Sequence, residues 1–245
     1  MLPTTTSTPP SSSSCPSLLS RSLSLSLMDF PSALDQMSLL LSLNPSSVYK
    51  TSYYRKQTKN HWARDDPAFI ILTFLLLIIS TICYSIAFTL SLSGFIYLLL
   101  ANFVIYAGLG LGVCMGTRYL ANSYLTTHRS HSVKQTVELM YSFDIHCNSF
   151  LILFVYLHIL QFFLLPILLT QTFLSLILSN FLYTAALSHY FYITHLGFRA
   201  LPFLINTQYF LYPIVAFVGL FLLGIVAYPL GLSINCARVM AMILF

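Results

Sequence analysis

Charged side chains are scarce in this chain of 245 residues, and the scarcity excludes an ordinary water-soluble protein. Asp, Glu, Lys and Arg make up 7% of the residues and hydrophobic residues 57%, with a mean hydropathy of +0.81. A globular chain is roughly 25% charged, which is what covers its water-facing surface. Of the 17 charged residues, 10 precede Pro67 and only 7 lie in residues 67–245. The composition therefore predicts a polytopic membrane protein.

Three long runs without a charged side chain define the membrane-embedded part. They cover residues 67–117, 145–198 and 200–237, which are 51, 54 and 38 residues long. A spanning helix needs about 20 apolar residues, so the first two runs each accommodate a helical hairpin. The third accommodates one span, because proline and amide side chains make its first part polar. We predict an all-α, five-span helical bundle within residues 67–245, with spans near 68–90, 94–115, 149–170, 173–195 and 209–232.

Basic residues are divided unevenly between the two sides of this predicted bundle. The N-terminal segment and the loops after the second and fourth spans carry ten of the eleven Lys and Arg residues, and Arg238 alone falls on the other side. Cytosolic loops of membrane proteins are enriched in Lys and Arg. We therefore expect a cytosolic N-terminus and a lumenal C-terminus.

Residues 1–47 differ from the rest of the chain in composition. They carry 15 serines and six prolines, a mixture that cannot bury a core, so we expect a disordered cytosolic tail. The alternation of Leu and Ser from Leu18 to Leu27 suggests a targeting segment as the alternative. Because Arg21 interrupts its short apolar run, the disordered tail is the favoured interpretation.

The segment 48–66 combines basic and aromatic side chains directly before the first predicted span. Such charge sets membrane orientation and attracts anionic lipid, and the alternative is a docking surface for a cytosolic partner. The same mixture is a weak hint of RNA binding, because no RNA-binding fold signature accompanies it. The candidate residues for partner or lipid docking are Arg55, Lys56, Lys59, Trp62 and Arg64.

Two helix starts are suggested by capping patterns. Asp66 before Pro67 predicts an N-cap for the first span, which is favoured over a paired-carboxylate site with Asp65. Ser132 opens the sequence Ser-Val-Lys-Gln, which matches a capping box. The apolar spacing that follows predicts a cytosolic amphipathic helix near 132–146, which lies on the membrane or packs on its own bundle.

Glycine spacing within the second predicted span predicts a helix-packing surface. Gly108, Gly112 and Gly116 recur every four residues, a double GxxxG pattern that permits close approach of another helix. The partner is a neighbouring span or a second copy of the chain, with packing inside one chain as the default. The sequence does not determine the oligomeric state.

Four polar side chains fall near mid-depth of the predicted spans: Asn102, His158, Gln161 and Asn180. Such groups line a transport path in some proteins, but more often they form hydrogen bonds between helices. Their placement separates the two interpretations. A transporter needs them around one cavity, whereas helix-stabilising groups are scattered among separate contacts.

Signatures of enzyme and metal sites are missing. There is no CxxC, HExxH or GxSxG motif, no P-loop and no nucleotide fingerprint. One loop is rich in possible ligands (His128, His131, Asp144, His146 and Cys147), but their spacing matches no recurrent zinc pattern. We expect no enzymatic activity, no metal and no cofactor, and we expect Asp144 and His146 to bond with backbone and loop groups where the third span begins.

Four strings of residues resemble a known family. They are YRKQTKNHWARDDPAF (Tyr54–Phe69), VELMYSFDIHCNSF (Val137–Phe150), LQFFLLP (Leu160–Pro166) and YFYITHLGFRALPFL (Tyr190–Leu204). In this order they are similar to the "uncoordinated-fifty" family of multi-pass Golgi membrane proteins, over about Tyr49 to Leu232.

The resemblance implies a non-enzymatic Golgi membrane protein in vesicular protein transport. It also implies delivery of membrane receptors to the cell surface and recruitment of guanine-nucleotide exchange factors for Arf GTPases. No catalytic residue is attached to the family, so none is expected here. A small-solute transporter or channel that uses the mid-membrane polar residues is the alternative function.

Overall fold

The computed structural model describes residues 28–127, 135–231 and 233–245, and this part of the chain is almost entirely helical. Its only extended pairing is one bridge between Thr126 and Leu204, so the described residues form no sheet. The prediction of an all-α membrane protein is confirmed.

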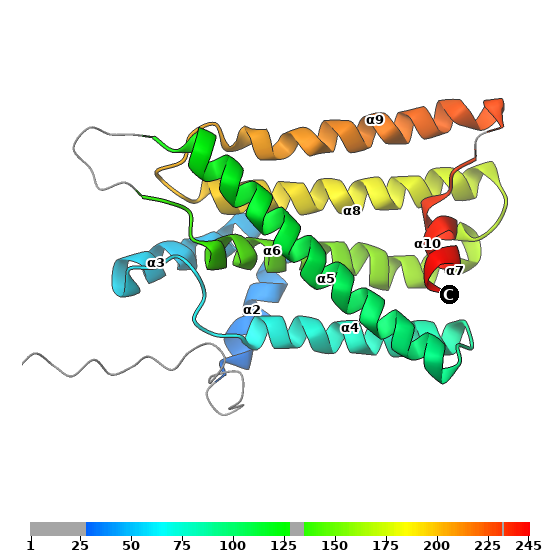
Figure 1. Cartoon of the computed structure of the whole chain (residues 1–245), viewed down its shortest axis with the longest axis horizontal. Coiled ribbons are helices and arrows are strands. Elements are labelled where there is room, and N and C mark those ends of the chain that lie inside the picture. Colours follow the sequence, from blue (N-terminus) through cyan, green and yellow to red (C-terminus); the bar gives the residue numbers. More distant parts are fainter. Residues whose placement is uncertain (1–27, 128–134, 232) are drawn as a thin grey trace, which may run out of the picture.

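Long helices run back and forth beside one another (Figure 1). The first two are α4 (Ala68–Ala87) and α5 (Leu92–Leu120), which ends in the π-helical turn η3 (Ala121–Leu125). Helix α6 (Leu139–Phe154) continues through the π-helical turn η4 (Val155–Leu160) into α7 (Gln161–Leu168). They are followed by α8 (Phe173–Arg199) and by α9 (Tyr212–Ala227), which lies between the 3-10 turns η5 (Thr207–Leu211) and η6 (Tyr228–Leu230). Helix α5 crosses the others obliquely (Figure 1).

Four of these helical stretches are long and apolar enough to cross a membrane: Ala68–Ala87, Leu92–Leu125, Leu139–Leu168 and Thr207–Leu230. Helix α8 has 27 residues, about 40 Å at 1.5 Å per residue, and packs between α6 and α9. Its composition is more polar, with Asn180 and two histidines. A membrane crossing by α8 therefore stays a prediction.

The third helical stretch begins ten residues before the predicted span at 149 and includes the second half of the amphipathic helix expected near 132–146. Among the described residues, that expectation is wrong for residues 135–138. Residues 135–138 are not helical, and α6 starts at Leu139 and continues into the bundle. The physical reason is that side chains of other segments bind this backbone. The Val137 N–H donates to Asn122 at 2.7 Å, and the Val137 carbonyl accepts from Arg118 at 3.1 Å.

The described N-terminal residues are folded, so the expected disorder is wrong for residues 30–47. Helix α2 (Phe30–Leu40) is capped by Asp29, whose carboxylate accepts from the Ser32 N–H at 3.0 Å. It buries Ala33, Met37 and Leu40 and packs on α4 and α6. The short helix η2 (Pro45–Tyr49) and helix α3 (Lys50–Lys59) follow it. Residues 1–27 lie outside the described part of the chain.

The bundle has two different ends. We use the name basic end for the end of the bundle that is formed by residues 28–66, 126–127, 135–138 and 200–206 (Figure 1). It includes helices α2 and α3. The opposite end carries only the short connections 88–91, 169–172 and 228–235 and the C-terminal helix α10 (Cys236–Leu244). Helix α10 folds back against α5, α7 and α8.

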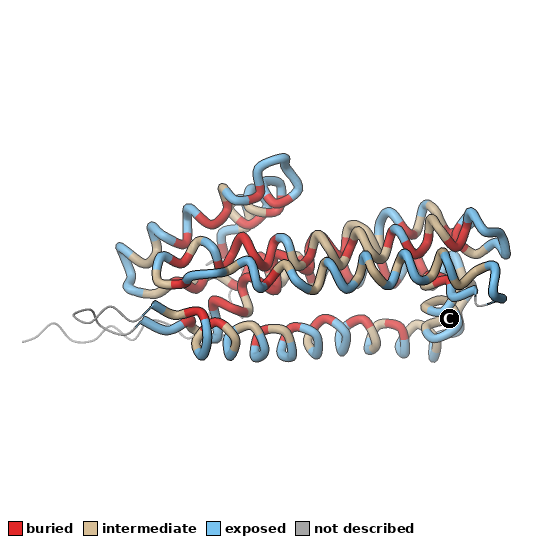
Figure 2. Tube along the Cα trace, turned by 90° about the horizontal axis from the view of Figure 1, so that it is seen from above, coloured by how far each residue is buried: buried red, intermediate tan, exposed pale blue. Residues whose placement is uncertain are grey.

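Burial follows the faces that the helices turn toward one another, and buried and exposed residues alternate along the long helices (Figure 2). Helix α5 buries every fourth residue between positions 98 and 114: Leu98, Asn102, Tyr106, Gly110 and Cys114. Helix α9 buries none and packs mainly on α8. The largest buried cluster joins α2, α4, α6 and α8 toward the basic end, whereas two small clusters lie toward the opposite end.

Candidate functional site

The non-helical segment after α3 is fixed by acidic side chains from α6 and the residue before it. Asn60 ends α3 in the left-handed conformation (φ 59°), which turns the chain back toward the bundle. The Trp62 N–H then donates to Glu138 at 3.2 Å, and the Arg64 N–H donates to Asp144 at 2.5 Å. Backbone donors buried away from water need acceptors, so these two carboxylates hold the segment in place.

The Arg64 side chain extends the same network. Its guanidinium donates to the Asn148 carbonyl oxygen and stacks over the Phe69 ring at 4.2 Å. Arg64 thereby connects the segment before α4 to α6 and to the start of α4 itself. We use the name junction for Tyr49, Trp62, Arg64, Glu138, Tyr141, Asp144 and Asn148.

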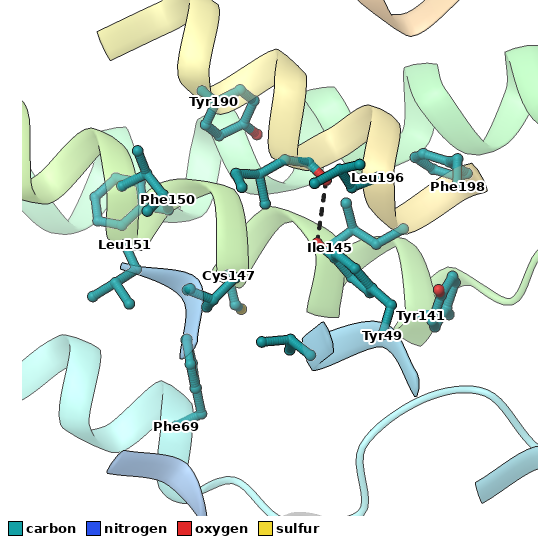
Figure 3. Close-up of a cluster of buried hydrophobic side chains, with 14 of the residues drawn as sticks. Tyr49, Phe69, Tyr141, Ile145, Cys147, Phe150, Leu151, Tyr190, Leu196 and Phe198 are labelled. Carbon is teal, nitrogen blue, oxygen red and sulfur yellow. Dashed lines mark hydrogen bonds between the residues drawn. The ribbon is translucent and has the colours of Figure 1, made fainter. Parts of the chain in front are cut away.

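Aromatic side chains complete the junction, as Figure 3 shows for Tyr49, Tyr141 and their neighbours from η2, α4, α6 and α8. The Trp62 ring is 3% exposed and lies 6.2 Å from both Tyr141 and Phe203. The Tyr49 hydroxyl donates to the Ile193 carbonyl at 3.2 Å, and the Tyr141 hydroxyl donates to the Gly197 carbonyl at 2.8 Å. Burial raises the pKa of Tyr49 above its usual value, so this hydroxyl stays a protonated donor.

The junction includes two of the five residues that were candidates for docking, and a docking role for Arg55, Lys56 and Lys59 stays a prediction. Trp62 is buried and Arg64 is held inside, so neither presents a free surface. Arg55 donates to Ser52 at 2.8 Å, and burial lowers the pKa of its guanidinium. Lys59 pairs with Asp65, and Lys56 donates to the Asn60 carbonyl at 2.8 Å.

The two predicted caps have different outcomes. The Asp66 carboxylate accepts from the Ala68 N–H at 3.0 Å with one oxygen and from the Asp29 N–H at 2.7 Å with the other. It therefore bonds both the first residue of α4 and the start of α2. Ser132 lies outside the described residues.

The glycine ridge faces outward, so the default of packing inside one chain is wrong. Gly108, Gly112 and Gly116 are exposed, and a Cβ atom on any of them meets nothing within 4 Å. Close approach instead occurs at two glycines that the spacing did not indicate. A Cβ on Gly110 would lie 3.0 Å from the His146 ring, and one on Gly197 would lie 2.7 Å from Ile145.

The four mid-membrane polar residues divide into two groups. Asn102 donates to Thr81 at 3.0 Å, and His158 bonds Ser80 at 2.9 Å, so both join α4 to another helix. Asn180 instead joins α8 to the C-terminal segment, since it donates to the Ile234 carbonyl at 2.9 Å and accepts from the Cys236 N–H at 3.0 Å.

Gln161 lies with Asn102 and His158 around one small cavity of about 80 Å³. Most of its lining is apolar, and Tyr84, Leu244 and Phe245 close it toward the opposite end. The buried Gln161 Oε1 atom has no hydrogen-bond partner among the described residues. Three of the four polar residues therefore converge, while Asn180 lies in a separate groove beside α9.

Possible metal ligands are dispersed. Asp144 holds the Arg64 N–H, His146 bonds the Tyr190 hydroxyl at 2.8 Å, and Cys147 lies 3.2 Å from the Tyr106 hydroxyl. Within the described ranges, no group of three His, Cys, Asp or Glu side chains has a geometry that could hold a metal ion. His128 and His131 lie outside those ranges.

Comparison with known proteins gives the family. The family model described as the UNC-50 family matches residues 18–245. The chain is 45% identical over 189 residues to "Protein unc-50 homolog" from Dictyostelium discoideum, covering 76% of this chain and 72% of that protein. This chain belongs to the UNC-50 family.

Animal UNC-50 proteins are similar over the same extent. The homolog from Homo sapiens is 41% identical over 196 residues, covering 79% of this chain and 74% of that protein. "Protein unc-50" from Caenorhabditis elegans is 43% identical over 196 residues, covering 79% of this chain and 63% of that protein. No solved structure matches.

The strings on which the UNC-50 resemblance was based meet in the fold. Three of them, from Tyr54, Val137 and Tyr190 onward, supply Trp62, Tyr141 and Gly197 to the junction and its contacts. Asp144 bonds a backbone N–H group as expected, whereas His146 bonds the Tyr190 hydroxyl. That the partner of Asp144 lies before α4, and that Glu138 bonds the same segment, was not predicted. The position of Glu138 and Asp144 as the only two acidic residues after Asp66 was the available signal.

Proposed function

We propose that this chain is a non-enzymatic adaptor in vesicular protein transport at the Golgi membrane. Membership of the UNC-50 family carries the proposal, because the family resemblance implies this location and role. On this proposal the chain helps to recruit Arf guanine-nucleotide exchange factors, to deliver membrane receptors to the cell surface, or both.

The proposed orientation has five spans, with the basic end in the cytosol and the C-terminus in the lumen. The described basic residues support it, since all of them except Arg238 lie at the basic end or on a helix turn that reaches it. Cytosolic enrichment of Lys and Arg is the general rule for membrane proteins.

The distribution of folded structure outside the bundle supports an adaptor that acts in the cytosol. Helices α2 and α3 give the basic end a surface that a peripheral protein can bind. The opposite end offers short connections and α10, which folds back on the bundle. On α3 the exposed residues Tyr53, Tyr54 and Gln57 are better candidates for partner contact than the internally bonded Arg55 and Arg64.

The test uses cells that lack their own UNC-50 protein and express this chain instead. We expect the chain at the Golgi, restored association of an Arf exchange factor with Golgi membranes, and restored receptor density at the cell surface. A double variant, Tyr54→Ala with Gln57→Ala, should lower the exchange-factor signal. The matched control Leu92→Ala, which changes a residue 77% exposed at the opposite end, should not. An abundant, folded chain that restores neither function would contradict the proposal.

A second candidate function, small-solute transport, rests on the convergence of Asn102, His158 and Gln161 on one cavity. The first two already bond α4, and apolar residues of α10 close the space. Solute flux in vesicles that contain the purified chain, abolished by Gln161→Leu, would favour this function over the adaptor.

A further inference from the structure

Two basic residues that are far apart in sequence line one groove at the basic end. Lys50 begins α3, and Arg199 is the last residue of α8. Both side chains are exposed, and both border a groove of about 560 Å³ between the segment 43–53 and the end of α8. Tyr53 and Tyr192 form part of its walls.

Among the described residues, Lys50 and Arg199 have no acidic partner, in contrast to Lys59. Within the described ranges, the ion pairs involve Lys59 and His61 with Asp65, and no acidic oxygen lies within 4.0 Å of Lys50 or Arg199. The groove lining contains no Asp or Glu. Two positive charges without internal neutralisation favour a ligand that carries negative charge.

The surroundings of the groove place it at the level of a lipid headgroup. Leu43 on its rim is fully exposed, and Leu41, two residues earlier in the chain, is 54% exposed. Large apolar side chains in this state are stabilised by contact with lipid rather than water. Tyr53 and Tyr192 are 49% and 43% exposed, and tyrosine is enriched at the interface between membrane and water.

We propose that this groove binds one anionic glycerophospholipid of the surrounding leaflet, with its phosphate between Lys50 and Arg199. The acyl chains then enter the bilayer beside Leu43 and Tyr192. This site is distinct from the earlier candidates Arg55, Lys56, Lys59 and Arg64, and it does not depend on the trafficking role.

The test is native mass spectrometry of the full chain in detergent, with equal amounts of phosphatidylserine and phosphatidylcholine that carry the same acyl chains. We expect one retained phosphatidylserine in clear preference to phosphatidylcholine. A basic residue near an anionic surface contributes roughly fivefold in affinity, so the double variant Lys50→Gln with Arg199→Gln should weaken phosphatidylserine retention by about 10- to 30-fold.

The matched control is Lys56→Gln with Lys59→Gln, which removes the same charge from α3 outside this groove. It should leave phosphatidylserine retention within twofold of the unmodified chain. Unfolding followed by fluorescence of Trp62, the single tryptophan, should be unchanged in the groove variant, because neither Lys50 nor Arg199 belongs to the junction.

Three results would overturn the proposal. They are equal retention of the two lipids by the unmodified chain, an equal loss in the groove and control variants, and displacement of the bound lipid by inorganic phosphate at a matched concentration. The last result would identify a site for free anions rather than for lipid.

Discussion

At the basic end, segments from four parts of the sequence meet around Trp62 and Tyr141, and acidic side chains hold their backbone. Toward the opposite end, residues of α4, α5, α6, η4, α7, α8 and α10 surround a mostly apolar cavity of about 80 Å³. At the basic end, carboxylates hold the backbone of a segment that precedes the first membrane helix. At the opposite end, apolar packing is supplemented by the amide side chains of Asn180 and Asn235, which hold the segment before α10. The two ends are therefore fixed by different polar groups, charged side chains at one end and amides at the other.

The largest expected effect follows from removal of the Trp62 ring. Trp62→Ala deletes a ring that is 3% exposed and touches Tyr53, Tyr141 and Phe203, and should cost about 3–5 kcal/mol of unfolding free energy. Thermal unfolding in mild detergent, followed by circular dichroism, measures it. Tyr54→Ala, at a residue 66% exposed in the same segment, is the control and should change stability by less than about 0.5 kcal/mol. Equal effects would show that the junction does not hold this end together.

The next effect separates close helix packing from an open glycine face. Gly197→Ala places a Cβ 2.7 Å from Ile145 and should destabilise by about 1–3 kcal/mol through overpacking. Gly112→Ala has nothing within 4 Å and should be neutral or stabilising, since alanine favours a helix by about 1 kcal/mol over glycine. Comparison of the melting temperatures of the two variants with that of the unmodified chain measures both effects. A marked loss for Gly112→Ala would place another helix, from a second copy, on the ridge.

A smaller effect is expected at the opposite end. The Asn235 amide donates to the Leu168 carbonyl and to Ser175, and its oxygen accepts from the Arg238 N–H. Asn235→Ala removes the cap from the Arg238 N–H, while the Ser175 hydroxyl still donates to the Leu168 carbonyl at 2.5 Å, so it should cost about 0.5–2 kcal/mol. Release of α10, seen as faster proteolysis after residue 235, should occur while the emission wavelength of Trp62 stays constant. A shift in Trp62 emission would mean that the two ends are coupled.

The smallest effect is expected from Gln161→Leu, because the buried Oε1 atom of this amide has no hydrogen-bond partner among the described residues. Removal of a buried polar group without a hydrogen bond is neutral or stabilising, within about 1 kcal/mol. Thermal unfolding compares this variant with His158→Leu, which breaks the bond to Ser80 and should be the less stable of the two. The reverse order would indicate that Gln161 has a bound partner in the purified protein.

The general architecture could be predicted from the sequence because it depends on long charge-free runs. Those runs predicted helices close to the observed α4, α5, α8 and α9. The start of α6 could not be predicted, because it depends on hydrogen bonds between the Val137 backbone and the side chains of Arg118 and Asn122. Spacing alone does not locate partners that lie elsewhere in the chain.

Two other predictions, of a disordered tail and of a glycine packing surface, were wrong because composition and spacing do not show which side chains face the bundle. The serine and proline content of residues 1–47 hid the apolar positions Ala33, Met37 and Leu40, although Asp29 before Phe30-Pro31 was a readable helix start. The GxxxG spacing identified small residues but not the face that they occupy. The buried face of α5 instead follows Asn102, Tyr106 and Gly110.

Insertion of glycosylation acceptors tests most directly the placement of the basic end in the cytosol by five spans. Each of four versions of the chain carries one Asn-Gly-Thr acceptor in a flexible linker, after Thr127, Gln171, Ile205 or Gly231. We expect no glycan at the first and third positions and efficient modification at the second and fourth. The same state at Gln171 and Ile205 would show that α8 does not cross the membrane. Modification after Thr127 would place the basic end in the lumen and contradict the proposed orientation.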